Sequence, residues 1–83
     1  MNRMIIFKVP SIILLEHHKG DTTRIICHRL NISYSYTLKS LNILKDEGII
    51  RFMGQFPKVV ILTEKGEKLQ NDLIRINEVL YGR

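Results

Sequence analysis

The chain has few of the residues that carry redox or covalent chemistry. Cys27 is the only cysteine among 83 residues, so no disulfide can form within the chain. A single cysteine fits a protein of the reducing cytoplasm. The chain has no Gly-rich phosphate loop, and no serine or cysteine stands beside a base in a recognisable catalytic motif. We therefore expect a cytoplasmic protein that is not an enzyme and that uses no cofactor.

Long hydrophobic runs are also lacking. The apolar stretch at residues 4–15 is interrupted by Lys8 and Pro10, and a membrane-spanning helix needs about 20 apolar residues. The stretch also lacks the small-residue cleavage site of a secretory signal. We expect no membrane partner. With 45% hydrophobic and 25% charged residues, residues 1–83 are expected to form one small folded domain, of a size that dimerisation often stabilises.

Metal-ligand spacing is missing as well. His17, His18, Cys27 and His28 are the candidates, but adjacent residues on a helix point about 100° apart. No Cys-x-x-Cys or His-x-x-x-His pair occurs. The sequence predicts no metal site, with His17 and His18 capping a helix end and Cys27 packed as a small core residue. A disulfide between the Cys27 residues of two copies is an alternative if Cys27 is exposed.

Positive charge, in contrast, is plentiful and unevenly distributed. The formal net charge is +5, from 13 Lys and Arg against 8 Asp and Glu. Residues 1–62 contain nine of these cations and four of the acids, whereas residues 63–83 contain four of each. This distribution predicts a polyanion partner for the first part and a protein partner for the last. A basic surface that is merely solvated is the alternative.

The first predicted helix covers about residues 10–19. Pro10 suits the first position of a helix, and Gly20 suits the position just after its end. Residues 12–15 are apolar on most sides, which predicts that another element or a second subunit covers this helix. Residues 1–9 are compatible with a strand, an extended arm or an earlier helix start.

Two more helices separated by a short turn are predicted next. Thr22 is expected to cap a helix over residues 23–30, and Asn31 tolerates the left-handed backbone of a tight turn. Ser33 is expected to cap a helix over residues 33–47. This pair is a helix-turn-helix. The outer face of the second helix carries hydroxyls, an amide, a cation and aromatic rings, and we interpret it as a surface that lies in a DNA groove.

A hairpin and a last helix complete the prediction. Gly48 ends the preceding helix, and residues 49–62 read as two short strands around a turn. Thr63 caps a helix over residues 63–80. The apolar positions of this helix have coiled-coil spacing, so we expect them to form a homodimer interface: Leu69, Leu73, Ile76 and Leu80.

In this order the elements resemble the winged helix-turn-helix regulators of the MarR-like and ArsR-like superfamily. The resemblance covers about residues 11–69 and rests on residues 22–33, on residues 33–50 and on the Leu-Thr-x-x-Gly pattern at 62–66. In length and isoleucine content the chain is similar to small archaeal and archaeal-virus regulators, so the host cytoplasm is the expected location if it is viral. The implied fold is α+β and mostly helical: a winged helix-turn-helix with a C-terminal dimerisation helix.

The implied function is sequence-specific binding of double-stranded DNA by a homodimeric transcriptional regulator. The chain is shorter than a typical MarR regulator and lacks the extra helices of that family's ligand pocket, so no small-molecule ligand is identified. Lys39 and Asn42 are expected to read bases, and Leu38 to be a half-buried core residue. A protein-docking module and a metal- or redox-responsive repressor are the alternatives. The candidate DNA-binding residues are Arg24, Arg29, Ser33, Tyr34, Ser35, Tyr36, Lys39, Asn42, Arg51 and Lys58.

Overall fold

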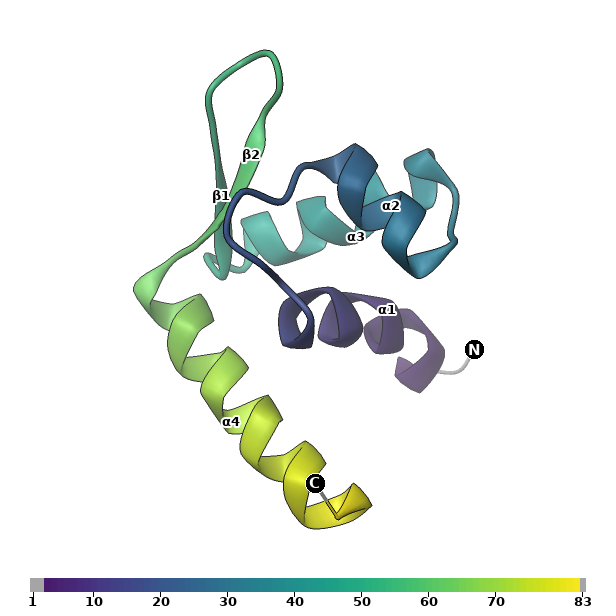
Figure 1. The fold of residues 1–83 in the computed structure, drawn as a ribbon, viewed down its shortest axis with the longest axis vertical. Helices are drawn as coiled ribbons and strands as arrows, with labels where there is room; N and C mark the ends of the chain where they lie inside the picture. The colour runs from purple at the N-terminus through teal and green to yellow at the C-terminus, as the bar shows by residue number, and fades with distance from the viewer. Residues whose placement is uncertain (1–2, 83) are drawn as a thin grey trace.

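The computed structural model describes the backbone of residues 3–82 and the side chains of residues 9–82. Helices α2 and α3 lie beside α1, the hairpin projects from one side of this group, and α4 extends away from the hairpin (Figure 1). This is the mostly helical winged-helix fold that the resemblance implied. The elements are α1 (Arg3–Leu15), α2 (Thr23–Leu30), α3 (Tyr34–Asp46), β1 (Ile50–Met53), β2 (Val59–Leu62) and α4 (Glu64–Tyr81).

Local signals determine where each helix of the helix-turn-helix begins and where the turn between them lies. The Thr22 hydroxyl accepts a hydrogen bond from the backbone N–H of Ile25 at 3.2 Å, and the Ser33 hydroxyl accepts one from Tyr36 at 3.1 Å. Asn31 has a left-handed backbone with φ of 57°, which lets α2 end and the chain turn into α3. These signals are local, and α2 therefore occupies the range that the sequence predicts.

The first helix differs from its prediction. It covers Arg3–Leu15 instead of residues 10–19, and Pro10 lies inside it. A proline in a helix interior removes one backbone hydrogen bond and costs about 3 kcal/mol, so the local pattern favoured a start at this residue. Pro10 is buried, however, and it lines an apolar depression against α3 and α4. Tertiary packing at Pro10 offsets the local cost.

The end of α1 also differs, because the next loop is drawn toward the hairpin. The His17 ring donates from Nε2 to the carbonyl of Val60 at 2.8 Å, and the backbone N–H of His18 donates to the carboxylate of Asp21 at 2.9 Å. These two histidines were expected to cap α1. They instead connect the loop between α1 and α2 to β2 and to Asp21.

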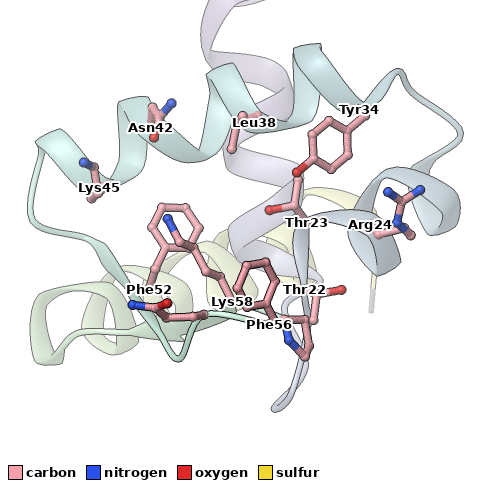
Figure 2. A pocket seen from close by; sticks show the side chains of 12 residues that line it. Thr22, Thr23, Arg24, Tyr34, Leu38, Asn42, Lys45, Phe52, Phe56 and Lys58 are labelled. Carbon is pink, nitrogen blue, oxygen red and sulfur yellow. The ribbon is translucent and has the colours of Figure 1, made fainter.

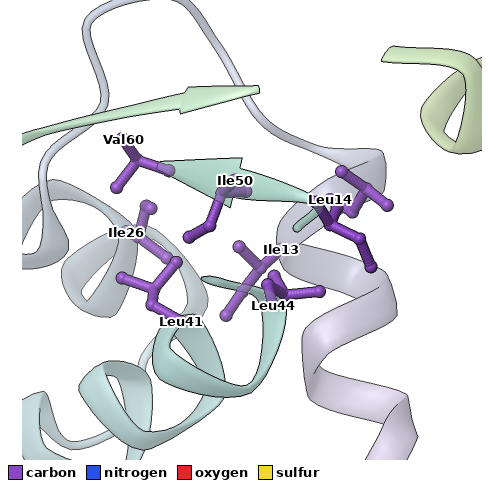
Figure 3. Close-up of a cluster of buried hydrophobic side chains, with 8 residues drawn as sticks. Ile13, Leu14, Ile26, Leu41, Leu44, Ile50 and Val60 are labelled. Atoms are coloured by element: carbon purple, nitrogen blue, oxygen red, sulfur yellow. The ribbon is translucent and has the colours of Figure 1, made fainter. Parts of the chain in front are cut away.

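The core lies where three helices and the hairpin meet. Side chains from α1, α2 and α3 contact the inner faces of both strands (Figure 3). The strands pair antiparallel from Ile50 opposite Leu62 to Met53 opposite Val59. A further bridge joins Thr22 to Val59, so β2 is also paired on its second side, at the end nearest the turn. The buried core residues are Ile13, Leu14, Ile26, Leu41, Leu44, Ile49, Ile50 and Val60.

The junction between the hairpin and α4 is held by Thr63 and Gly66. The Thr63 hydroxyl donates to the carbonyl of Gly48 at 2.6 Å and accepts from the N–H of Gly66 at 3.1 Å. A Cβ on Gly66 would overlap the carbonyl oxygen of Ile49. The Leu-Thr-x-x-Gly pattern therefore has a physical basis, because the start of α4 touches the backbone of Ile49, between α3 and β1.

The second half of α4 projects beyond the core. Leu73 packs against the core cluster, and Leu69 lines the apolar depression beside α1. Ile76 and Leu80, in contrast, are 52% and 66% exposed. Four positions that look equivalent by spacing thus divide into an inner pair and an outer pair. Within residues 3–82, no helix has the length and apolar character that crossing a membrane requires.

We predict that Gly66→Ala destabilises the fold. Alanine is favoured over glycine in helices by about 1 kcal/mol, but overlap with a backbone atom that cannot rotate away costs about 3 kcal/mol. The net loss of about 2 kcal/mol would be measured by urea unfolding. Lys68→Ala, at an exposed position of the same helix, is the control and should change stability by less than about 0.5 kcal/mol. A stabilised Gly66→Ala variant would contradict this packing.

Candidate nucleic-acid interface

A groove of about 660 Å³ lies between α3, the start of α2 and the hairpin. We call it the wing groove. Helix α3 forms one wall, and β1 with the hairpin turn forms the other (Figure 2). The two walls come from segments that are separated in the chain, so only the folded hairpin creates the groove. Its lining residues are Thr22, Thr23, Arg24, Tyr34, Leu38, Asn42, Lys45, Phe52, Gln55, Phe56, Pro57 and Lys58.

The composition of the wing groove is one-sided in charge. Three of its lining residues are cations, namely Arg24, Lys45 and Lys58, and none of the described residues that line it is acidic. Asn42 and Gln55 add amides that both donate and accept hydrogen bonds. A concave surface of one sign concentrates field lines and attracts ligands of the opposite sign. The groove is therefore suited to a polyanion.

Each wall of the groove holds a cation over an aromatic ring. The guanidinium of Arg24 lies 5.5 Å from the centroid of the Tyr34 ring. On the hairpin side, the ammonium of Lys58 lies 5.9 Å from the centroid of the Phe52 ring. Such contacts contribute about 0.5–1 kcal/mol at exposed sites. They restrict two long, flexible side chains, so positive charge is held on both sides of the groove.

Helix α3 presents three distinct surfaces. Thr37, Ser40, Leu41 and Leu44 are buried. Leu38 lines the wing groove and is half-buried. Ser35, Lys39 and Asn42 point away from the core, as the helical repeat of about 100° per residue requires.

The predicted site residues on α3 are therefore split between these surfaces. Tyr34 and Asn42 line the groove, whereas Ser35 and Lys39 are exposed beyond its edge. Tyr36 points about 200° from Tyr34 around the helix. It lies outside the groove.

The two cations expected on the hairpin lie on opposite faces. Lys58 lines the groove. Arg51 precedes Phe52 in β1, and successive side chains of a strand point to opposite faces. Since Phe52 faces the groove, Arg51 faces away from it and is exposed to solvent. Both residues were candidate DNA-binding residues, and the fold places them on opposite faces of the hairpin.

Comparisons with known proteins agree with this geometry. Residues 3–80 match the family model described as winged helix-turn-helix. This chain belongs to the winged helix-turn-helix family. A comparison with curated proteins found no match.

Solved winged-helix structures share the fold at low sequence identity. AF1382 from Archaeoglobus fulgidus superposes with a TM-score of 0.80 at 16% identity, covering 96% of this chain and 98% of that one. A MarR transcriptional regulator from Methanosarcina mazei gives 0.76 at 24% identity, covering 96% and 67%. Streptococcus pneumoniae FabT, solved in complex with DNA, gives 0.73 at 18% identity, covering 89% and 53%. The chain spans only 61% and 64% of the length of two further matched structures, the transcriptional regulator SlyA and Lactococcus lactis ZitR.

Arg29 has a structural role in this winged helix. Its guanidinium donates to both carboxylate oxygens of Asp21, at 3.1 and 2.5 Å, and to the carbonyl of Glu16 at 3.3 Å. The side chain of Arg29 is only 28% exposed. The phosphate contact expected of Arg29 is therefore not the role that its geometry supports. The sequence pattern missed this pairing because Asp21 lies in the preceding loop.

Asp21 is an ionised carboxylate inside the fold. Burial by itself raises the pKa of Asp21. The hydrogen bonds from Arg29 and from the His18 amide, with the positive charge of Arg29, outweigh burial and leave this pKa below its ordinary value of 3.8. The same contacts raise the pKa of Arg29. The pair therefore stays ionised and joins α2 to the loop before it.

Cys27 is a core residue. It is 8% exposed, and its Sγ donates to the carbonyl of Arg24 at 3.2 Å. A disulfide between two copies would require an exposed thiol. The burial of Cys27 therefore argues against a redox-responsive repressor that acts through this cysteine. In the part of the chain that the structure describes, no three His, Cys, Asp or Glu residues gather as a possible metal site.

Eight of the twelve residues that line the wing groove were not among the candidate DNA-binding residues. Lys45 lies eleven positions after Tyr34, which is close to three helical turns, so this spacing was a usable signal. Phe52 is two residues after the buried Ile50, so strand alternation places both side chains on the same face of β1. Gln55 and Phe56 belong to the turn, and no periodicity determines where turn side chains point. Their place in the groove depends on the folded hairpin.

We predict that Asp21 makes stability depend on acid pH. Its folded pKa is lowered, so its contribution is present above the unfolded pKa, near 4, and is lost as pH falls through the folded pKa. Asp21→Asn should lower the free energy of unfolding by about 2 kcal/mol at neutral pH. The gap between variant and wild type should shrink toward about pH 2. Urea unfolding across this range measures both.

Asp72→Asn is the matched control for this prediction. Asp72 pairs with Arg75 at 2.6 Å, but the two side chains are 44% and 69% exposed. Exposed pairs contribute little, so this variant should stay within about 0.5 kcal/mol of wild type. A gap for Asp21→Asn that stays constant across the pH range would contradict the lowered pKa.

Proposed function

We propose that this protein binds double-stranded DNA in a sequence-specific manner and regulates transcription as a homodimer. The observation that carries the proposal is the wing groove, which is free of lining acids and holds cations on both walls. FabT, which shares the fold, was solved in complex with DNA. The excess of positive charge in residues 1–62 adds a long-range attraction for a polyanion.

In this proposal α3 enters the major groove. Lys39 and Asn42 point away from the core near the middle of the helix, where side chains reach base edges. Asn can contact adenine through two hydrogen bonds, and Lys can donate to the acceptors of guanine. The N–H groups at the start of α3, with the hydroxyl of Ser35, are suited to phosphate oxygens. The Ser33 hydroxyl already caps the helix.

One sugar–phosphate strand would then lie in the wing groove. Arg24 and Lys58 reach it from opposite walls, each positioned over an aromatic ring. Lys45 adds a third cation near the end of α3. The hairpin would lie against the neighbouring minor groove. Phosphate contacts from α2, α3 and the hairpin supply affinity, which compensates for the low positive charge of α3 itself.

The dimer is proposed to form through the outer half of α4. Ile76 and Leu80 are more than half exposed on a helix that extends beyond the core, whereas Leu69 and Leu73 mainly cover the chain's own core. Two copies joined in this way would present two α3 helices. Successive major grooves on one side of a duplex lie about 34 Å apart, so we expect a near-palindromic site.

A docking module is less well supported than DNA binding. Docking of a basic partner would be favoured by an acidic patch over α3, but the described residues that line the wing groove include no acid. DNA and an acidic protein both suit a basic groove. The exposed polar face of α3, with an amide and a cation at its centre, has the chemistry of base readout.

We predict that duplex DNA binding depends steeply on salt. If each subunit of a dimer neutralises three or four phosphates, log K falls against log salt with a slope of about −5 to −7. Fluorescence anisotropy between about 50 and 200 mM salt measures this slope. Lys58→Ala should make it shallower by about 2, since each subunit loses one phosphate contact. No binding at the lowest salt would refute the proposal.

Arg51→Ala is the matched control for Lys58→Ala. It removes the same charge from the same hairpin, but on the face that points away from the groove. We expect its slope to stay close to that of wild type. Equal effects of both variants would show that net charge, and not the wing groove, determines binding.

We predict that Ile76→Glu combined with Leu80→Glu converts the dimer to a monomer. Glutamates at the proposed contact would place like charges opposite each other in an apolar interface. Sedimentation equilibrium should give the 9.7 kDa mass of one chain for this variant and twice that mass for wild type. Asn77→Glu, at an exposed position between them, should remain dimeric. A monomeric wild type would remove dimerisation from the proposal.

A further inference from the structure

The tip of the hairpin carries an exposed aromatic ring that the fold does not use. Phe56 is 96% exposed, more than any other large hydrophobic residue among those described. Burying a phenylalanine side chain contributes about 1.5–3 kcal/mol, and this ring gains almost none of that within the chain. It therefore contributes little to stability and is available for a partner.

The surroundings of Phe56 indicate what that partner is. Phe56 lines the wing groove together with Lys58 and Arg24 (Figure 2). The described residues that line this groove include no acid. An apolar protein surface or a second copy would gain nothing from these cations. A nucleic acid supplies both phosphates for the cations and flat bases for the ring.

The ring is held at the far end of a well-anchored hairpin. Strand pairing ends at Met53 opposite Val59, and Phe56 lies in the turn beyond that pair. Close to that last pair, β2 is fixed to the loop before α2 by the hydrogen bond from the N–H of Val60 to the carbonyl of Asp21 at 2.8 Å. A tip that is anchored in this way positions its side chain before binding, which lowers the entropic cost of contact.

We propose that Phe56 is an apolar wedge that enters the minor groove of bound duplex DNA and partly unstacks one base step. Proteins that bend DNA through the minor groove use phenylalanine and other apolar side chains in this way. Pyrimidine–purine steps unstack most easily, so Phe56 determines specificity at a position that it contacts without hydrogen bonds. The inference rests on the proposed DNA binding.

The test uses a duplex selected from a random pool by the wild-type protein, labelled at both ends for energy transfer. Wild type should bend this duplex. Phe56→Ser should abolish most of the bend and weaken binding by about tenfold, because ring burial exceeds the cost of unstacking. The salt slope should stay unchanged, since no phosphate contact is lost. A duplex in which the pyrimidine–purine step contacted by Phe56 is replaced should be bound equally by both proteins.

Two further variants separate a wedge from a general effect. Phe56→Leu keeps an apolar side chain and should retain most of the bend. Met53→Ser changes an apolar residue that is 49% exposed on the same hairpin. Met53 does not line the wing groove, so this variant should bind and bend as wild type does. Circular dichroism should show all three variants folded, since neither position is buried.

The outcomes distinguish the wedge from the function on which it rests. If wild type selects no duplex, DNA binding itself fails. If wild type binds but Phe56→Ser binds and bends equally well, the wedge is wrong and DNA binding stands. A loss confined to single-stranded DNA would assign the ring to base stacking and overturn the wedge. A change in oligomeric state of Phe56→Ser would assign it to a contact between copies and also overturn it.

Discussion

The buried carboxylate of Asp21 is the contact on which the arrangement of the helix-turn-helix and the hairpin depends. Its side chain accepts hydrogen bonds from Arg29 of α2 and from the His18 amide, and its backbone carbonyl accepts one from Val60 of β2. One residue thus joins the first loop, α2 and the hairpin. A carboxylate in that position requires Arg29 as its partner, because an unpaired buried charge costs several kcal/mol. The hairpin and the helix-turn-helix therefore keep a defined relative position.

That relative position creates the wing groove. Its walls belong to α3 and to the hairpin, which are held apart at one end by the α4 junction at Thr63 and Gly66. Cations from α2 and from the hairpin lie over aromatic rings on the two sides of the groove, so its positive charge does not depend on α3 alone. Under the proposed function, phosphate contacts are shared by α2, α3 and the hairpin, which compensates for the low positive charge of α3.

Much of the fold and part of the site were predictable. Thr22, Asn31 and Ser33 act through local hydrogen bonds and backbone conformation, which depend on neighbours in the chain. Reasoning from neighbouring residues also gave the wrong start for α1, at Pro10. The sequence does not show that Pro10 is buried against α3 and α4. Arg29 and Arg51 were grouped with Arg24 and Lys58 by charge alone. The fold pairs Arg29 with a buried acid and turns Arg51 to the other face of the hairpin.

The sequence by itself determined the order of the elements, the helix caps, the unequal distribution of charge and the exposed face of α3. Each of these follows from spacing or from contacts within a few residues. Tertiary structure alone decided which cations are available, that Gln55 and Phe56 share a groove with α3, and which apolar residues of α4 remain uncovered. The reason is physical: charge pairing and burial depend on distances between segments that only long-range packing brings together.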